Sequence, residues 1–309
     1  MNLKNIIFVL VVVVFLLQIL TLQEDKQSPQ DAQKKPTIAL STFPLYDVAK
    51  NIAKDKIETY MILPVGVDVH SYEPNPKQIV KLFKSDLVIF SGASLEPWIS
   101  RLDFKNKVLD MSKYVMLIEM DASHHHAHEE HTHADEHTDP HYWLSINNMK
   151  KITKKITAEI IKLDPKNKDF YKDNALAYLK KLDALDRAYK TTLSSCKKSE
   201  ILTNHNAFSY LAKEYGFKVL SLSAFSPDAE VNAKNMIRLM QEIKKLHIST
   251  IFYESFASSR AVKTLAQEVG VQVEVLQPLA NITKNELGLS YEDIMSTNLV
   301  KLKKAMECR

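Results

Sequence analysis

Histidines are the residues of this chain with the clearest capacity for chemistry, and the eleven present are unevenly spread. Seven lie in the segment 123–138, which is rich in acids and has no apolar periodicity. Such a segment cannot pack a core, and imidazoles and carboxylates at this density bind borderline metal ions weakly. We therefore expect a solvated loop with weak metal sites, the alternative being an inert polar spacer. The loop histidines are His124, His125, His126, His128, His131, His133 and His137.

Three of the other four histidines lie at junctions between predicted elements. His70 lies in a turn after an apolar run of strand length, and His205 follows a second such run. His141 follows Pro140, which restricts the backbone, and precedes a long helical pattern. Each could be structural by itself, but ligand sites form at the carboxyl ends of strands, so the three could converge on one metal ion. His247 ends an amphipathic helix and is expected on the surface.

Two zinc-enzyme motifs nearly occur in the histidine-rich loop. His128 and His131 are three positions apart, whereas the zinc-protease signature needs a spacing of four on one helix face. The run from His131 to His137 loosely resembles that of binuclear zinc hydrolases, but it has an extra residue before its last histidine. A hydrolase also needs a positioned general base beside a zinc-bound water. The motifs provide neither, so we expect no catalytic residues and no enzyme.

Apolar runs of strand length alternate with amphipathic stretches, which predicts parallel α/β layers. The predicted strands are Thr37–Leu40, Ile57–Ile62, Asp86–Phe90, Ile201–Thr203, Val219–Leu222, Thr250–Tyr253 and Val271–Leu276. The predicted helices are Tyr46–Ile52, Lys77–Phe83, Phe208–Tyr215, Val231–Leu246, Ser258–Val269 and Tyr291–Met306. Between the two groups, a helical periodicity starts at Asn147 and resumes after Pro165, which predicts one long helix with a bend at that proline.

A chain of 309 residues has room for two packed cores. The pattern therefore predicts two Rossmann-like α/β lobes joined by one long connecting helix, with a ligand site at the lobe interface. The expected parts are a signal peptide at 1–23, a polar leader at 24–35, an N-terminal lobe at 36–146, a connecting helical region at 147–195 and a C-terminal lobe at 196–309.

The first residues have the pattern of an export signal. Lys4 precedes an unbroken apolar stretch from Ile6 to Leu17, and polar residues follow. This indicates a cleaved signal peptide and a periplasmic protein, with an uncleaved anchor as the alternative. No cysteine follows the stretch to accept a lipid. The net charge of +4 is small and its lysines and arginines are scattered, which argues against a nucleic-acid partner.

Cysteine usage fits an oxidising compartment. Cys196 and Cys308 are the only two cysteines, and they form one disulfide candidate that would tie down the C-terminus. Two unrelated thiols are the alternative. Neither cysteine is close to a histidine in sequence, which argues against a thiolate metal ligand.

The three histidine contexts together resemble the periplasmic solute-binding proteins of zinc and manganese ABC transporters, the cluster 9 or cluster A-I family. Within that family the chain is most similar to the zinc-specific high-affinity uptake proteins. The resemblance spans most of the chain and implies a buried metal ion between two lobes and its delivery, by a monomer, to an ABC permease in the inner membrane. Its motifs are Phe43–Tyr46, Val65–Pro74, Ser91–Gly92, Leu95–Trp98, Asp139–Leu144, His205–Phe208, Ile251–Glu254 and Asn298–Leu299.

Transferred to this chain, the family's histidine ligands are His70, His141 and His205. In many relatives a carboxylate lies two residues before the tyrosine that opens the last helix, and here Leu289 occupies that position before Tyr291. The resemblance thus leaves the fourth ligand open to a water or a loop histidine. The nearby acids are out of register with that position, and they are Glu286, Glu292 and Asp293.

Three imidazoles with an open fourth position suit a tetrahedral zinc ion, whereas manganese prefers more oxygen ligands. The histidine-rich loop, a feature shared with zinc-specific members, also favours zinc, although copper is chemically possible. We therefore expect one tight Zn²⁺ site and further weak ions on the loop. The competing hypotheses are a manganese or iron subunit of the same transporter class, an exported zinc hydrolase, and an adhesion protein that uses metal structurally.

Overall fold

The structure, a computed structural model, describes residues 35–105, 107–119, 138–223, 233–255 and 260–309. Residues Pro36–Arg309 form one compact unit. The predicted signal peptide at 1–23, the polar leader up to residue 34 and the seven loop histidines lie outside the described residues. In the described ranges, no helix is both long enough and apolar enough to cross a bilayer.

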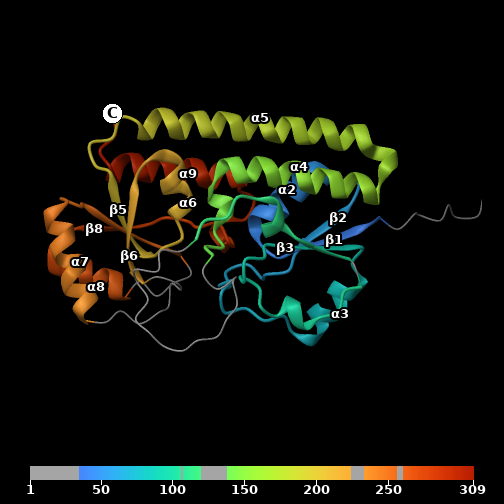
Figure 1. The fold of residues 1–309 in the computed structure, drawn as a ribbon, viewed down its shortest axis with the longest axis horizontal. Helices are drawn as coiled ribbons and strands as arrows, with labels where there is room; N and C mark the ends of the chain where they lie inside the picture. The colour runs from blue at the N-terminus through green and yellow to red at the C-terminus, as the bar shows by residue number, and fades with distance from the viewer. Residues whose placement is uncertain (1–34, 106, 120–137, 224–232, 256–259) are drawn as a thin grey trace, which may run out of the picture. The chain divides into compact units, whose positions relative to one another are not determined.

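The N-terminal lobe is built on a parallel sheet of four strands in the order β2-β1-β3-β4 (Figure 1). The first three strands are β1 (Thr37–Leu40), β2 (Glu58–Met61) and β3 (Leu87–Phe90), and each confirms a predicted strand. The edge strand β4 (Val108–Asp110) is not predicted, because three residues are too few to show a strand pattern.

The C-terminal lobe has a second parallel sheet with the same connectivity, in the order β6-β5-β7-β8. In the N-terminal sheet, β1 lies between β2 and β3. In the C-terminal sheet, β5 lies in the same way between β6 and β7. The carboxyl ends of β5 and β7 therefore form a switch point, where open α/β sheets bind ligands. All four predicted strands are confirmed: β5 (Glu200–His205), β6 (Lys218–Ser223), β7 (Thr250–Tyr253) and β8 (Gln272–Val275).

Side chains from both faces of each sheet are buried, as parallel sheets require. Neighbouring strand residues point to opposite faces, so Ile201 of β5 packs into a core shared by the two lobes and Leu202 into an outer core of the C-terminal lobe. Helices α2, α6 and α9 contribute to the shared core, α3 to the outer core of the N-terminal lobe, and α7 and α8 to that of the C-terminal lobe. Their bounds are α2 (Phe43–Ala53), α3 (Pro76–Lys84), α6 (Ser209–Tyr215), α7 (Ala233–Lys245), α8 (Arg260–Val269) and α9 (Tyr291–Ala305).

The region predicted as one helix with a bend is two helices, α4 (Ile146–Leu163) and α5 (Lys168–Leu193). Proline disfavours helical backbone in the preceding residue, and Asp164, before Pro165, has a non-helical φ of −140°. The Asp164 carboxylate accepts a hydrogen bond from the Tyr171 hydroxyl at 2.6 Å. The chain therefore reverses direction at this point instead of bending.

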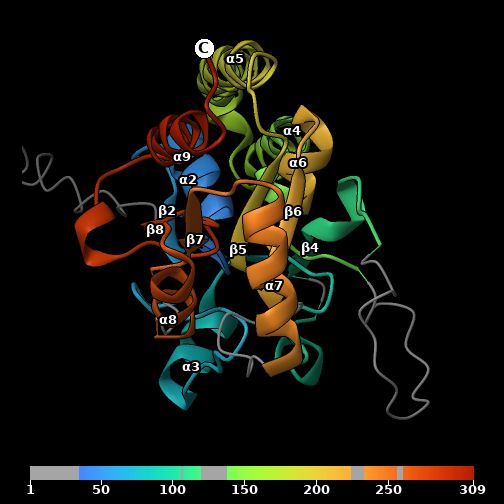
Figure 2. The same cartoon turned by 90° about the vertical axis from the view of Figure 1, so that its left-hand side faces the viewer.

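Helix α5, with 26 residues, is the longer of the two helices in the predicted connecting region. It runs back along α4, as the ion pair between Lys150 Nζ and Asp183 Oδ1 at 2.6 Å shows, and it also packs on α2 and α9 (Figures 1 and 2). Beyond its end, Cys196 and Cys308 form the predicted disulfide, which ties the C-terminus to the start of the C-terminal lobe.

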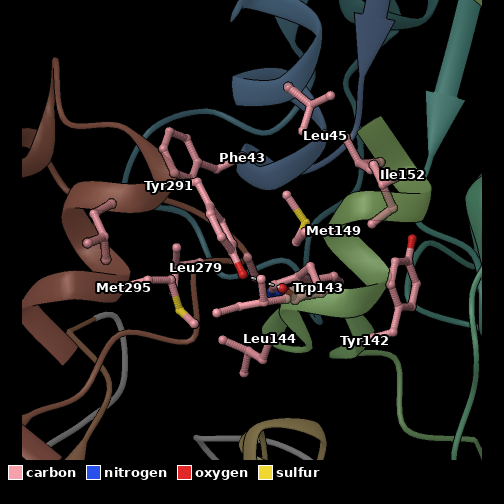
Figure 3. Close-up of a cluster of buried hydrophobic side chains, with 14 of the residues drawn as sticks. Phe43, Leu45, Tyr142, Trp143, Leu144, Met149, Ile152, Leu279, Tyr291 and Met295 are labelled. Atoms are coloured by element: carbon pink, nitrogen blue, oxygen red, sulfur yellow. Dashed lines mark hydrogen bonds between the residues drawn. The ribbon is translucent and has the colours of Figure 1, made fainter. Parts of the chain in front are cut away.

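A buried cluster around Trp143 joins the two lobes (Figure 3). The ring centroids of Trp143 and His141 are 5.5 Å apart. The Trp143 indole donates a hydrogen bond to the carbonyl oxygen of Pro278 at 2.7 Å, and its own carbonyl oxygen accepts one from the Tyr291 hydroxyl at 2.7 Å. Phe43 of α2 and Leu279 belong to the same cluster. The backbone beside His141 is therefore fixed to the C-terminal part of the chain.

Candidate metal centre

The structure brings the three predicted ligands together. Within the described ranges, His70, His141 and His205 are the one group of three or more histidines, cysteines or acids whose potential ligand atoms all lie within 4.8 Å of one another. The ring centroids are 5.3 Å apart for His70–His141 and for His141–His205, and 5.8 Å apart for His70–His205. Nitrogens around a tetrahedral zinc ion are about 3.3 Å apart. Small ring movements are therefore enough for one ion to contact all three rings.

The three ligands come from different parts of the fold. His205 is the last residue of β5, at the switch point between β5 and β7. His141 directly precedes a short 3-10 turn, Tyr142–Leu144, which leads into α4. His70 lies in the loop between β2 and α3. The centre therefore lies between the N-terminal and C-terminal lobes, as predicted.

Burial keeps the imidazoles of His70 and His205 neutral. His141 and His205 are 3% and 1% exposed, and His70 is partly buried. Burial, followed by the two neighbouring imidazoles, lowers the pKa of His70 from 6.5 to about 2, and burial followed by His141 lowers the pKa of His205 to about 3. Neutral imidazoles carry the lone pair that a metal ion needs. His70 and His205 are therefore in the ligating form at neutral pH.

Asp139 orients the His141 ring. Its Oδ1 accepts hydrogen bonds from both the backbone N–H of His141, at 2.9 Å, and the ring Nδ1, at 2.8 Å. The aspartate is buried, so this contact is shielded from water. A histidine that donates from one ring nitrogen to a carboxylate presents the other to a metal. The contact therefore leaves Nε2 of His141 as the atom available to a metal ion.

Glu254 has the equivalent role for His205. It directly follows β7, which pairs with β5, so both residues lie at one edge of the sheet. The Glu254 Oε1 atom contacts Nδ1 of the His205 ring, and both side chains are buried. Two of the three imidazoles are thus supported by a buried carboxylate, an arrangement common around protein-bound zinc.

The Nε2 atoms of His141 and His205 are buried without a hydrogen-bond partner in the part of the chain that the structure describes. A buried polar atom without a partner costs about 1–3 kcal/mol, so folded proteins rarely contain one. One metal ion would satisfy both atoms. The residues present therefore fit an ion that prefers nitrogen ligands, such as zinc.

The acids near the expected carboxylate position are engaged elsewhere. Glu286 accepts hydrogen bonds from the Gln277 amide at 2.7 Å, Glu292 pairs with a lysine of α5, and Asp293 caps the start of α9. Leu289 is 42% exposed and offers no ligand atom. None of them belongs to the histidine group, so this part of the chain adds no fourth ligand.

The other predicted metal residues do not join the described centre. The seven loop histidines lie outside the described residues, but Glu119 and Thr138, on either side of them, pair as an isolated antiparallel bridge. Since Thr138 precedes Asp139, the loop leads directly into the segment that carries His141. His247 follows α7 and is exposed, which confirms its predicted surface position.

The roles of Asp139 and Glu254 were not predicted from the sequence, although both residues lie in the motifs Asp139–Leu144 and Ile251–Glu254. A signal for Asp139 is present, because a carboxylate two residues before a candidate ligand can reach both its backbone N–H and its ring. Glu254 follows an apolar strand directly, as His205 ends one. Placing these two residues together requires the strand order, which the sequence does not show.

Comparisons with known proteins show the family to which this chain belongs. Residues 38–305 match the family described as "Zinc-uptake complex component A periplasmic", or ZnuA. The high-affinity zinc uptake system protein ZnuA of Bacillus subtilis (strain 168) is 35% identical over 289 residues, which cover 91% of this chain and 91% of that protein. The zinc-binding lipoprotein AdcA of Streptococcus pneumoniae serotype 4 is 32% identical over 289 residues, but this chain spans only 57% of its length.

A solved structure extends the similarity to the fold. The crystal structure of the Zn(II)-bound ZnuA-like domain of Streptococcus pneumoniae AdcA has a TM-score of 0.74 and 31% identity to this chain, and the match covers 88% of this chain and 99% of that one. This confirms the predicted two-lobed α/β fold. The family consists of solute-binding transport proteins, not enzymes. The chain belongs to the ZnuA family of zinc-uptake complex component A proteins.

Proposed function

We propose that this protein captures Zn²⁺ outside the cytoplasmic membrane and delivers it to the permease of an ABC-type importer. The observation that carries the proposal is the meeting of His70, His141 and His205, with buried Nε2 atoms on two of them. The zinc uptake and zinc-binding names of the relatives support zinc as the cargo. The apolar segment near the N-terminus supports export as the route to this location.

Zinc fits the donor set better than manganese or iron. The described residues supply three imidazole nitrogens, and acids lie behind two of the rings, at Nδ1, where they orient the imidazoles. Manganese prefers a larger number of oxygen ligands. A water or a histidine of the 123–138 loop completes a tetrahedral shell around the zinc ion.

Tight capture requires an active means of release. A nanomolar site corresponds to about −12 kcal/mol of binding free energy, so the ion leaves slowly unless the coordination is disturbed. The ligands come from both lobes and from the junction before α4, so a relative movement of these parts on docking to the permease separates the ligands. The protein acts as a monomer, and the histidine-rich loop supplies weak sites that collect zinc near the centre.

Competitive titration with zinc and manganese tests the proposal, with the ion count read by native mass spectrometry. The protein spanning residues 36–309 is compared with its His205→Ala variant. We expect one tightly held zinc in the wild type, its loss in the variant, and weaker ions held by the loop in both proteins. Tight manganese binding, or tight zinc that survives His205→Ala, would refute the assignment.

Growth of the source cell under zinc limitation tests delivery. Deletion of the gene in a strain without a second zinc importer should slow growth at low zinc, and the wild-type gene but not the His205→Ala gene should restore it. Unchanged growth of the deletion strain at low zinc would favour a role in adhesion, with the metal only structural, over transport. Restoration by the variant would show that delivery does not need His205.

A further inference from the structure

The segment between β8 and α9, residues 276–290, crosses from the C-terminal sheet to the N-terminal lobe, and we call it the strap. At its start, the Gln277 backbone N–H donates to Asn298 Oδ1 at 3.1 Å and its carbonyl oxygen accepts from Asn298 Nδ2 at 2.7 Å, which fixes the strap to α9. Leu279 is fully buried and has a φ of +62°, a conformation that is costly for leucine. Strained backbone of this kind persists only where the surrounding structure enforces it.

Directly after Leu279, the strap binds the N-terminal lobe. The backbone N–H of Phe43, at the start of α2, donates to the carbonyl oxygen of Ala280 at 3.1 Å. The backbone N–H of Gly66 donates to the carbonyl oxygen of Ile282 at 3.0 Å. The strap therefore holds both the first turn of α2 and the loop that leads to His70.

The Asn281 side chain adds two further hydrogen bonds to this attachment. Its side-chain Nδ2 donates to the carbonyl oxygens of both Pro64 and Val67, each at 2.7 Å, and it is 1% exposed. Its Oδ1 accepts from the backbone N–H of Ile282 at 2.8 Å, which fixes the direction of the amide. One side-chain amide thus binds two backbone carbonyl oxygens, which lie six and three residues before His70.

His70 depends on this attachment more than the other two ligands do. Carboxylates hold the rings of His141 and His205, whereas in the described ranges no hydrogen bond is present at the His70 ring. The backbone N–H of His70 donates to Asp68 Oδ1 at 3.1 Å, a contact inside the same loop. The position of the His70 imidazole is therefore set by where its loop is held, and Asn281 holds that loop.

We infer that Asn281 is a positioning residue for His70, a role that rests on the proposed zinc site. By tying residues 64–67 to the strap, Asn281 makes the position of an N-terminal ligand depend on the C-terminal lobe. Loss of the amide donors frees the loop, so the His70 ring spends less time where His141 and His205 can share an ion with it.

The test compares Asn281→Ala and Asn281→Asp with the wild type and with Asn174→Ala. Asn174 is a matched control because its Nδ2 also donates to a backbone carbonyl oxygen, that of Ile52, but it joins α5 to α2 and does not touch the loop. We expect the zinc Kd to rise about 10- to 100-fold in both Asn281 variants, mainly through faster dissociation, and to stay within about twofold of wild type in Asn174→Ala. An unchanged Kd in both Asn281 variants would overturn the inference.

Imidazole nitrogen NMR on the metal-free proteins separates positioning from general destabilisation. In the folded Asn281 variants, the His70 ring signals should shift while those of His141 and His205 stay in place. Equal shifts of all three rings, or of none, would overturn the positioning role. This readout needs no zinc, so it can fail or succeed independently of the proposed function, which fails if the wild type binds no zinc tightly.

Hydrogen exchange on the wild type provides a test that needs no variant, should the Asn281 variants fail to fold. The Gly66 amide is bonded to the strap, so zinc bound at His70 should slow its exchange about tenfold or more. Unchanged exchange at Gly66 on zinc binding would overturn the inference.

Discussion

The metal centre has two differently built parts. His141 and His205 are almost fully buried, lie at the ends of regular elements, and contact buried carboxylates through Nδ1. His70 is more exposed and lies in a loop that is held by backbone and amide hydrogen bonds to the strap. We call His141 and His205 the braced pair. We therefore expect the braced pair to be in place before zinc arrives, and His70 to complete the proposed site and to be the easiest ligand to withdraw.

Removal of a ligand should have the largest effect, and its size should depend on which ligand is lost. We expect His205→Ala to weaken zinc binding by about a thousandfold or more, roughly 4 kcal/mol, because it removes a braced ligand and leaves Glu254 buried beside a cavity. His70→Ala should cost less, about a hundredfold, because water can replace a ligand at this more exposed position. Competition with a zinc chelator of known affinity measures both. Equal losses would contradict the distinction between the two parts.

Neutralising the bracing carboxylates should weaken binding without removing a ligand. Asp139→Asn and Glu254→Gln should each raise the zinc Kd about 10- to 100-fold, because an amide stabilises the imidazole orientation and basicity less well. Asp164→Asn is the control, since Asp164 is buried at the reversal between α4 and α5 and touches no metal residue. It should lower the melting temperature while the zinc Kd stays the same. Chelator competition and thermal unfolding measure the two quantities.

The stability of the metal-free protein should fall in acid. Folding lowers the pKa of His70 to about 2 and that of His205 to about 3, against 6.5 in the unfolded chain, so the unfolded state binds more protons between pH 6.5 and 3. The free energy of unfolding therefore decreases as the pH falls through this window. Glu96 has the opposite effect, because burial raises the pKa of its carboxyl from 4.5 to about 7. The stability that the protonated Glu96 contributes is therefore lost as the pH rises towards 7.

Comparison with a variant isolates the histidine contribution from that of Glu96. Urea unfolding of metal-free wild type and His205→Gln between pH 7 and 4 should show a smaller acid loss in the variant, because glutamine does not titrate. Parallel stability curves for the two proteins would show that His205 is not held neutral by burial.

Replacing the histidine-rich loop should have the smallest effect on the tight site. Substitution of residues 123–137 by a glycine-serine linker removes all seven loop histidines. It should remove the weak ions but leave the Kd of the tight zinc within about threefold, because the three ligands lie outside the loop. Native mass spectrometry and chelator competition report the two properties. A large rise in the Kd of the tight ion would instead make a loop histidine the fourth ligand.

Much of this architecture is predictable from the sequence, because it depends on local patterns. The apolar strands, their helices and the ligands His141 and His205 are marked by periodicity and by their place at element ends. The reversal at Asp164 is harder to predict, because apolar spacing continues through it and only Pro165 marks the break. Strand β4 is too short to be recognised.

The contacts that position the ligands are less predictable. Glu254 meets His205 only because β5 and β7 are neighbours in the sheet, and Asn281 reaches Pro64 across 217 positions of the chain. Neither residue stands out by type, since buried carboxylates and amides also have purely structural roles. Sequence patterns therefore identify which residues can bind the ion, and the tertiary fold identifies which residues hold them.

Zinc-edge X-ray absorption spectroscopy on the one-zinc form of residues 36–309 reports the zinc ligands themselves. We expect three imidazole nitrogens at about 2.0–2.1 Å, at most one further nitrogen or oxygen, and no sulfur. In His70→Ala, two imidazoles should remain. Fewer than three imidazoles in the wild type, or a shell of mainly oxygen ligands, would contradict the assignment of His70, His141 and His205 as the zinc ligands.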